Sequence, residues 1–387
     1  MHVSGPHDAF TERLMRHALA LALRGEGAVE PNPMVGAVVT AAADAAAEPR
    51  IVGEGWHAGF GGPHAEVVAL AAAGPAARGG TLVVTLEPCC HQGKTPPCVG
   101  AIIAAGIRRV VVAIRDPFPA VDGGGIAALR RSGIEVHEGV CAAEARRLVA
   151  PFRMLVEHRR PWTIAKWAMS LDGRIATAGG ESRWITSPPA RDLVHRLRGR
   201  MDAILCGIRT ALADDPLLTA RPPGPRRPLR IVLDRSARLP LTSRLVRTAH
   251  EVPVLVAAGP DAPLDRLRAL EAAGCELWQA TTAQPREAVS ELLSALGSRQ
   301  VTNLLVEGGP TVLGSFADAR LLDEVWAFIA PTIIGGALAS APVGGVGSTA
   351  LATAASIEVE HAGPVGPDML VRGLIRRSAD RDATVAG

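Results

Sequence analysis

Three short segments of this chain carry the residue types of a zinc site, and they constrain its possible folds more than any other feature. They read His64-Ala-Glu66, Glu87-Pro-Cys89 and Pro96-Pro-Cys98. One imidazole and two thiolates give zinc three protein ligands, so a tetrahedral ion keeps one open position. Water can occupy that position and is then acidic enough to act as hydroxide near neutral pH. Glu66 follows His64 too closely to be an easy fourth ligand, so we expect it to move protons.

The segments around these ligands have the patterns of regular structure. The apolar run 64–73 predicts a helix that His64 opens, and the run 80–88 predicts a buried strand that ends at Cys89. Ligands at a helix start and a strand end are held rigidly, as catalysis requires. A structural zinc site with four protein ligands is the alternative. Cys90 would then be the fourth ligand and Glu66 would be idle, whereas otherwise Cys90 is a small buried neighbour.

Composition limits the classes of function. The 387 residues suggest two or three domains, and the net charge of +3 excludes a strong electrostatic grip on nucleic acid or an anionic membrane. Aromatic residues make up 3% and Tyr is absent, which disfavours base stacking. The six Cys form no disulfide framework, and no apolar run approaches the roughly 18 residues of a membrane span. We therefore expect a cytoplasmic protein that binds neither nucleic acid nor membranes.

Strand patterns alternate with helix patterns in both halves of the chain, which predicts three-layer α/β sheets. Charged residues and Pro interrupt the pattern at 158–161, so we place one domain at 1–155 and a second at 156–387. Residues 40–50 are expected to form a hairpin loop, and the polar tail after Ser378 is expected to fray. The expected strands are 34–39, 51–57, 80–88, 109–114, 134–136, 162–165, 203–206, 230–234, 252–256, 303–309 and 323–331, and the expected helices are 8–24, 64–73, 101–105, one opened by 123–125, 142–155 and 264–273.

Polar side chains flank the proposed ligands on loops, where substrate contacts are common. One group comes from the loop between the two cysteines, in which Lys94 could pair with a phosphate as a point charge. Each side chain alone could be an ordinary turn or solvated residue. The candidates for contact with substrate are Asn32, His57, His91, Lys94 and Thr95.

The first half resembles the deaminase of riboflavin biosynthesis. The resemblance rests on the run 85–98, on His-Ala-Glu upstream and on Pro31-Asn-Pro33 before that. Eight residues separate Cys89 from Cys98, and this extended loop distinguishes the family from cytidine and tRNA adenosine deaminases. The family usually has Ser where this chain has Cys90. The resemblance implies a cytidine-deaminase-like three-layer α/β domain with one zinc, bound by His64, Cys89 and Cys98.

The second half resembles the reductase that is often fused to this deaminase. The resemblance implies a dihydrofolate-reductase-like α/β fold, use of NADPH and a homo-oligomer that acts on small pyrimidine ribosyl phosphates. A diamino-pyrimidinone ribosylamine phosphate would lose its 2-amino group as ammonia, and its ribosyl part would then be reduced to a ribityl chain. The motifs that carry the resemblance are 166–176, 182–186, 207–210, 214–221 and 306–310.

Apart from this resemblance, the residues of the second half indicate their function less clearly. A G-x-G-x-x-G fingerprint does not follow the first predicted strand, but the Gly-rich turn at 306–315 lies between a strand and a helix start, where backbone N–H groups can hold a pyrophosphate. Arg198 and Arg221 offer bidentate forks for a substrate phosphate. Lys166 and Asp214 are the ionisable groups nearest to the cofactor motifs, so we expect them to serve the hydride step.

The resemblance also implies two sets of contacts by motif position. Those with substrate are Ser182, Arg198, Leu218, Arg221 and Glu307, and those with NADPH are Ala168, Trp184, Thr210, Asp214, Ser236, Gly309, Pro310, Thr311, Val312, Leu313, Gly314 and Ser315.

Two other functions remain to be weighed. One is a nucleoside or tRNA deaminase with an unrelated C-terminal domain, although a tRNA-binding protein should carry a basic patch. The other is a protein without catalytic activity that is held together by a structural zinc.

Overall fold

The computed structural model describes residues 9–42, 49–93 and 96–376. The chain divides into two compact units, Met1–His158 and Arg159–Gly387, which are described separately. The boundary that we expected between residues 155 and 156 falls inside helix α6 (Ala150–His158). The expected tail after Ser378 and most of the expected loop at 40–50 lie outside the described residues. Within the described ranges, the structure contains no helix with the length and apolar character needed to cross a membrane.

Unit 1 is built on a five-stranded sheet with the order β2-β1-β3-β4-β5. β1 runs antiparallel to both β2 and β3, whereas β3, β4 and β5 are parallel. The amino end of β1, the carboxyl end of β2 and the carboxyl ends of β3 and β4 therefore meet at one edge. The strands are β1 (Gly36–Thr40), β2 (Ile51–Trp56), β3 (Thr81–Val84), β4 (Arg109–Val112) and β5 (Glu135–Glu138).

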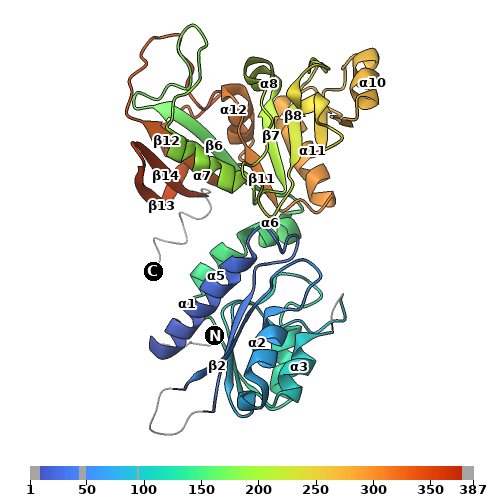
Figure 1. Ribbon diagram of the computed structural model, residues 1–387, viewed down its shortest axis with the longest axis vertical. Helices are drawn as coiled ribbons and strands as arrows, with labels where there is room; N and C mark the ends of the chain where they lie inside the picture. Colours follow the sequence, from blue (N-terminus) through green and yellow to red (C-terminus); the bar gives the residue numbers. More distant parts are fainter. Residues whose placement is uncertain (1–8, 43–48, 94–95, 377–387) are drawn as a thin grey trace. The chain divides into compact units, whose positions relative to one another are not determined.

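Helices cover both faces of this sheet. Successive strand residues point to opposite faces, so neighbouring apolar residues of one strand pack into two different cores. Val83 packs in one core with α1 and α5, while its neighbour Val84 packs in a second core with α2, α3 and α4. Figure 1 shows α1 and α5 on one side of the strands and α2 and α3 on the other. This is the predicted three-layer arrangement. The helices are α1 (Ala9–Ala22), α2 (Ala65–Ala73), α3 (Cys98–Ala104), α4 (Gly124–Arg131) and α5 (Ala142–Leu148).

Two glycines let these helices approach the strands closely. A Cβ on Gly36 of β1 would lie 2.0 Å from the carbonyl oxygen of Ala18 in α1. A Cβ on Gly55 of β2 would lie 2.4 Å from the carbonyl oxygen of Ala65, the first residue of α2. Larger residues would push these helices away, so the position of the α2 start, and of His64 just before it, depends on Gly55.

Unit 2 contains a nine-stranded sheet with the order β10-β9-β8-β7-β11-β6-β12-β14-β13. The strands from β10 to β12 are parallel, and β14 and β13 extend the sheet in antiparallel pairs. The sequence analysis missed β10, β13 and β14. The strands are β6 (Trp162–Ser170), β7 (Ala203–Gly207), β8 (Leu229–Leu233), β9 (Val254–Ala258), β10 (Glu276–Gln279), β11 (Asn303–Val306), β12 (Glu324–Ala330), β13 (Ser356–Val365) and β14 (Asp368–Arg376).

Two cores lie on the opposite faces of this second sheet. Ile204 and Val232 pack with α7, α9 and α10 on one face, and Leu205 and Ile231 pack with α11 and α12 on the other. Unit 2 is therefore also a three-layer α/β structure. Its helices are α7 (Pro188–Arg198), α8 (Ile208–Asp214), α9 (Arg244–Arg247), α10 (Leu264–Ala272), α11 (Pro285–Ser298) and α12 (Pro310–Asp318).

A buried ion pair joins the beginnings of β6 and β12. Arg160 donates to the two carboxylate oxygens of Asp323 over 2.6 and 2.7 Å, and Asp323 also accepts the Thr163 N–H at 2.9 Å. Removal of one partner of such a buried pair is strongly destabilising, because the other charge loses its partner in a poorly solvated position. Arg160 therefore stabilises the fold of unit 2.

Because unit 2 has two cores of its own, we expect the fragment 159–387 to fold alone and to melt in one cooperative transition. In this fragment, Arg160→Ala should lower the free energy of unfolding by about 3–5 kcal/mol. Arg159→Ala, next to it in the sequence, is the control. Chemical denaturation followed by circular dichroism measures both effects. A fragment without a cooperative transition would show that the second unit depends on the first.

Candidate functional site

Unit 1 brings the three predicted zinc ligands together at one edge of its sheet. His64 lies directly before α2, Cys89 follows β3, and Cys98 is the first residue of α3. Their ligand atoms all lie within 4.8 Å of one another. The Nδ1 atom of His64 is 3.2 Å from Cys98 Sγ and 3.5 Å from Cys89 Sγ. One imidazole nitrogen and two sulfurs at such distances can surround a single zinc ion.

Cys90 does not belong to this group. Its Sγ is 3.9 Å from the carbonyl oxygen of Ala120 and packs against Gly124, on which a Cβ would lie 2.9 Å from that sulfur. Among the residues that the structure describes, the group of His, Cys, Asp and Glu side chains able to hold a metal has three members, His64, Cys89 and Cys98. This geometry favours a site with an open coordination position over the structural site with four protein ligands.

Glu66 is buried in the first turn of α2, beside the cluster. Its exposed fraction is 3%, and burial raises the pKa of its carboxyl to about 7. A carboxyl with such a pKa can both accept and donate a proton near neutral pH. The position therefore suits the proton transfer that we expected from the sequence.

His57 and Asn32 lie next to the cluster. The His57 Nδ1 is 3.0 Å from the carbonyl oxygen of Pro63, which can only accept, so this nitrogen carries the proton. Its Nε2 is 3.2 Å from Asn32 Nδ2 and accepts from that amide. Burial lowers the pKa of His57, in agreement with a neutral ring. The ring meets that of His64 edge to face, with centroids 5.6 Å apart.

Two other expected contacts lie in the loop between the cysteines. The ring of His91 lies against Phe118, with centroids 5.8 Å apart. Lys94 and Thr95 lie outside the described residues.

Glu87 holds the segment before Cys89 in place, a role that the sequence analysis missed. Its buried carboxylate accepts the backbone N–H groups of Asp116, Gly123 and Ile126 at 3.2, 2.9 and 3.0 Å. These donors lie after β4 and at the start of α4. Glu87 thus holds the turn that leads to Cys89 against its neighbours.

Unit 2 carries a pocket of about 1170 Å³ over the carboxyl ends of β6, β7, β8, β9 and β11. Open parallel sheets bind ligands at this edge. Most of the predicted reductase residues line the pocket, although they come from distant parts of the sequence. They are Lys166, Ala168, Ser182, Trp184, Arg198, Thr210, Asp214, Leu218, Arg221, Glu307, Gly309, Pro310, Thr311, Val312 and Ser315.

Three predicted residues are not among those that line the pocket. Leu313 is fully buried in the core under α12. A Cβ on Gly314 would lie 2.4 Å from the carbonyl carbon of Gly344, so Gly314 faces another loop. Ser236 is exposed in the loop after β8. For the first two the reason is geometric, because consecutive residues of a helix point in different directions.

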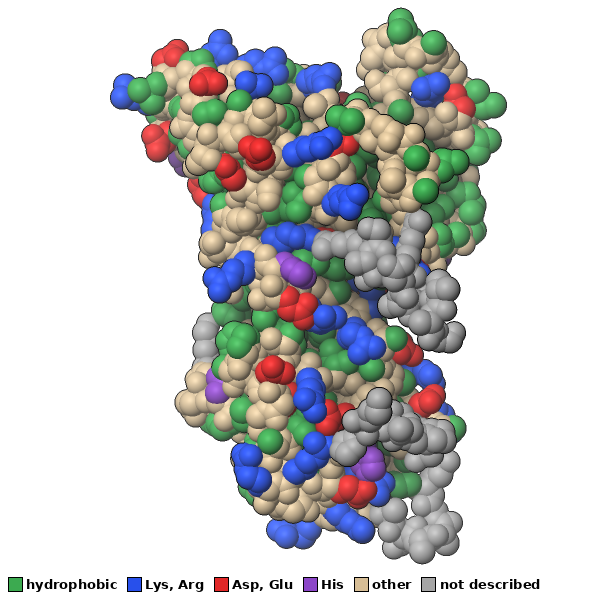
Figure 2. Space-filling view, turned by 180° about the vertical axis from the view of Figure 1, so that it is seen from behind, with side chains coloured by type: hydrophobic (Ala, Val, Ile, Leu, Met, Phe, Trp, Pro, Cys, Tyr) green, Lys and Arg blue, Asp and Glu red, His purple; other side chains and the backbone are tan. Residues whose placement is uncertain are grey.

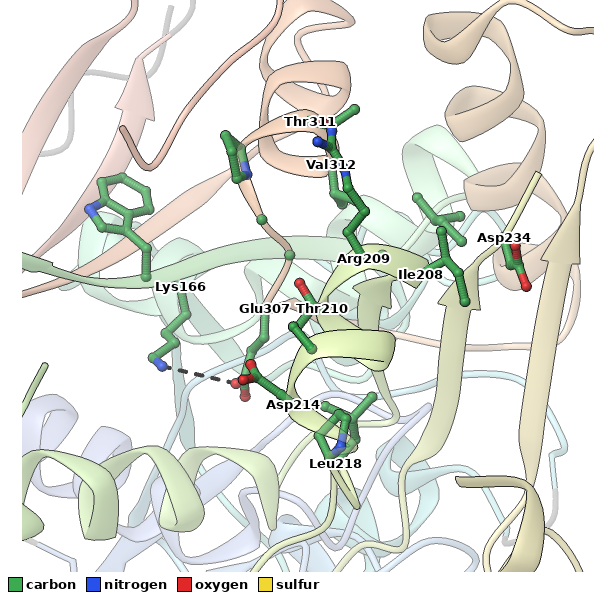
Figure 3. Close-up of a pocket in the computed structure, with 18 of the residues that line it drawn as sticks. Lys166, Ile208, Arg209, Thr210, Asp214, Leu218, Asp234, Glu307, Thr311 and Val312 are labelled. Atoms are coloured by element: carbon green, nitrogen blue, oxygen red, sulfur yellow. Dashed lines mark hydrogen bonds and ion pairs between the residues drawn. The ribbon is translucent and has the colours of Figure 1, made fainter. Parts of the chain in front are cut away.

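Glu307 is the centre of a charged network in this pocket. It accepts from Nε and Nη2 of Arg198, each at 2.7 Å, and Lys166 Nζ lies 3.9 Å from its Oε2 (Figure 3). Burial alone would raise the pKa of Glu307, but the charges of Arg198 and Lys166 outweigh it and lower the value to about 2. Burial lowers the pKa of Lys166, which makes its ammonium group a better proton donor.

A second group of polar side chains lies further along the pocket. Asp214 Oδ1 is 3.0 Å from Arg183 Nε, and Arg221 donates to His195 Nε2 over 3.3 Å. Arg209 of α8 donates to the hydroxyl of Thr311 at the start of α12. The sequence analysis named neither Arg183, His195 nor Arg209 as site residues. Two of them lie inside quoted motifs, so a charged residue at a motif position was the available signal.

The comparisons with known proteins agree with both sites. The family described as "Cytidine and deoxycytidylate deaminase zinc-binding region" matches residues 9–114, and "RibD C-terminal domain" matches residues 161–371. The riboflavin biosynthesis protein RibD of Aquifex aeolicus is 40% identical over 92% of this chain and 96% of its own length. That of Escherichia coli is 38% identical over 92% and 97%.

The chain belongs to the RibD family. A solved RibD structure from Acinetobacter baumannii superposes with a TM-score of 0.82 at 34% identity and covers 95% of this chain and 99% of that one. The family and these structures confirm the predicted fold class and bifunctional riboflavin-biosynthesis enzyme, with zinc and NADPH as cofactors. The matched reductase domain also removes the alternative of an unrelated C-terminal domain.

The ligand geometry leads to a test of the metal site. We expect Cys98→Ser to lose most of its zinc, because one thiolate of a three-ligand site is gone. Cys90→Ser should keep one zinc per chain, because Cys90 lies outside the ligand group. Elemental analysis of the purified full-length variants measures the ratio of zinc to protein. Loss of zinc from Cys90→Ser would contradict the three-ligand assignment.

Proposed function

We propose that this chain deaminates 2,5-diamino-6-ribosylamino-4(3H)-pyrimidinone 5′-phosphate and then reduces its ribosyl group to ribityl with NADPH. A solved relative from Thermotoga maritima, 36% identical, is described as a diaminohydroxyphosphoribosylaminopyrimidine deaminase and 5-amino-6-(5-phosphoribosylamino)uracil reductase. The observation that carries the proposal is the presence of both sites in one chain. Unit 1 has a His64, Cys89 and Cys98 cluster beside a buried Glu66, and unit 2 has a separate pocket around Glu307.

In the deaminase unit, His64, Cys89 and Cys98 would hold zinc, which when bound makes a water molecule acidic. The carboxylate of Glu66 accepts a proton from the attacking water as its oxygen bonds to ring carbon C2. It then donates this proton to the amino nitrogen, the C–N bond breaks and ammonia leaves. The proton that remains on the new hydroxyl moves to the adjacent ring nitrogen as the C2 carbonyl forms. Asn32 gives its N–H to His57, so its carbonyl oxygen remains an acceptor for the substrate. We assign His57, His91, Lys94 and Thr95 to substrate binding as well.

Glu66→Gln tests this proton transfer, because it keeps the shape of the side chain and removes the base. We expect ammonia release to fall by about 10²–10⁴-fold while zinc remains bound. Release of ammonia from the diamino-pyrimidinone phosphate and zinc content are measured on the same preparation. The reductase activity of the variant towards the deaminated substrate is the internal control. Full deaminase activity in a zinc-loaded variant would refute the role of Glu66.

In the reductase unit, bound NADPH would supply a hydride for C1′ of the open imine form of the substrate, whose nitrogen would then receive a proton from a side chain. Lys166 is our candidate for the proton donor, because burial lowers its pKa and Glu307 keeps it in place. We propose that Arg198 acts on the substrate through Glu307. Two of its three nitrogens bind Glu307, so Arg198 orients this carboxylate, which in turn contacts the substrate.

Arg221 is therefore our candidate for binding the substrate phosphate. It lines the pocket together with His195 and Arg244. Among the described side chains, no carboxylate forms an ion pair with it. Burial and the charges of Arg198 and Arg244 lower the pKa of Arg221, which indicates a cluster of positive charge. Ser182 and Leu218 complete the proposed substrate contacts.

For the cofactor we propose the lining residues Ala168, Trp184, Thr210, Asp214 and Ser315 and the turn from Gly309 to Val312. Gly309 caps α12, whose first N–H groups can hold the pyrophosphate. Leu313 and Gly314 could contact the cofactor only through backbone atoms. Ser236 could contact it only if the loop after β8 changed its conformation. We also propose a cytoplasmic homo-oligomer. The free cysteines support the compartment, and exposed apolar side chains of unit 2, such as Leu338 and Leu351, support the assembly.

Two variants separate the proposed roles in the reductase pocket. Asp214→Asn should lower kcat by about 10²-fold or more with little change in NADPH affinity, because we propose that Asp214 also serves the hydride step and the amide keeps its shape while losing its charge. Arg221→Ala should mainly raise the substrate KM, by about 10–100-fold, because a charged hydrogen bond is lost from uniform binding. Arg247→Ala, an exposed arginine outside the pocket, is the control. Steady-state kinetics on the deaminated substrate decides between the roles. If Asp214→Asn only weakened NADPH binding, Asp214 would position the cofactor without a catalytic role.

A further inference from the structure

His195 is an ionisable side chain of the reductase pocket that has no role in the proposed function. It lies on α7 and lines the pocket, as does Arg198 one turn later on the same face of the helix. Arg198 is occupied by Glu307, whereas Arg221 donates to His195 Nε2 over 3.3 Å. A hydrogen bond therefore joins His195 to the arginine that we propose for the substrate phosphate.

The carboxyl end of α7 holds the segment that carries Arg221. A Cβ on Gly199, directly after α7, would lie 2.9 Å from the Cα of Gly224. Arg198 donates through Nη1 to the carbonyl oxygen of Thr219 over 3.4 Å. The chain is thus held against α7 on both sides of Arg221, so the approach of this arginine to the imidazole is built into the backbone.

The contact with Arg221 fits a neutral imidazole. A guanidinium group can only donate, so Nε2 of His195 accepts and the proton of the neutral ring lies on Nδ1. Burial and the positive charges of Arg198 and Arg221 lower the pKa of His195. The backbone carbonyl of Thr219 and the charge of Glu307 oppose this shift but are weaker.

Positive charge predominates around this ring. Glu307, the carboxylate that acts on it, is already paired with Arg198. Arg221 keeps its charge beside the ring, and Arg244 acts on Arg221 in turn. An anion is therefore attracted to this part of the pocket. The charged side chains that line the pocket on the surrounding elements are Lys166 of β6, Arg183 before α7, Arg191 and Arg198 of α7, Asp214 of α8, Arg221, Arg244 of α9 and Glu307 after β11.

A phosphate bound by Arg221 changes what the imidazole must do, and here the inference rests on the proposed reductase function. A phosphate dianion and the lone pair of a neutral Nε2 are both acceptors, so they would repel each other beside one guanidinium. A single proton between them turns this repulsion into a charge-assisted hydrogen bond. Free phosphate monoesters and free imidazoles have pKa values of about 6 and about 6.5. Both are mostly unprotonated at slightly alkaline pH, so the shared proton comes from solution.

We propose that His195 is a further substrate-binding residue of the reductase pocket and shares one proton with the 5′-phosphate that Arg221 binds. Binding of the substrate then takes up a proton, whereas binding of NADPH does not. The affinity for the substrate therefore falls as the pH rises above neutrality, because the proton becomes scarcer.

Steady-state kinetics of the zinc-loaded full-length chain tests this proposal. From about pH 7 to about pH 9, the KM for the deaminated substrate should rise by up to about tenfold per pH unit, while the KM for NADPH stays within about twofold. His195→Gln should abolish this dependence on pH, because an amide can donate to the phosphate without titrating. His250→Gln, an exposed histidine outside the pocket, should keep the wild-type dependence. Thermal melting checks that each variant is folded.

Isothermal titration with the deaminated substrate, without NADPH, measures the proton directly. In Tris and HEPES at about pH 8, whose ionisation enthalpies differ, the wild-type chain should take up about one proton per substrate and His195→Gln none. Binding without proton uptake in the wild-type chain would overturn the inference and leave the reductase function intact. So would proton uptake that persists in a folded His195→Gln variant. A wild-type chain that does not oxidise NADPH with this substrate at any pH would instead overturn the proposed function on which the inference rests.

Discussion

Both sites depend on one geometric constraint, the meeting of strand ends at a single edge of each sheet. In unit 1 the antiparallel pairing of β1 with β2 and β3 places Asn32, before β1, and His57, after β2, at the edge where β3 leads to Cys89. In unit 2 parallel strands deliver Glu307 and the turns after β7 and β8 to the same edge. Residues far apart in the sequence become neighbours there, because the residues that flank the meeting strand ends lie close together.

Buried charge at these edges is stabilised in two different ways. Glu87 accepts three backbone N–H groups and thereby holds a turn in place. Glu307 is instead neutralised by side chains, since Arg198 binds both of its oxygens and Lys166 lies 3.9 Å away. A network of side chains can exchange protons and contact a ligand, whereas backbone donors cannot change their charge. Glu307 is therefore suited to contact with a reacting ligand, whereas Glu87 is suited to holding its turn.

Local sequence patterns predicted the zinc cluster and most strands, because these depend on short-range signals. His64, Cys89 and Cys98 stand at a helix start and a strand end that apolar runs announce. β13 was missed because most of its side chains are exposed, so it has no apolar run. His195, which lies in none of the motifs, reaches the pocket only through the order of the strands, which no local pattern contains. The run 309–315 was treated as one binding segment, yet helix geometry turns Leu313 into the core.

The charge of the whole chain says little about the potential inside the reductase pocket. The net charge is only +3, and on the face seen in Figure 2 acidic and basic side chains are interspersed. Within the pocket, however, several arginines contribute to the lining, and Glu307 pairs with one of them, Arg198. A cavity with low-dielectric walls focuses such local charge. The pocket can therefore attract phosphorylated ligands although the chain as a whole is almost neutral.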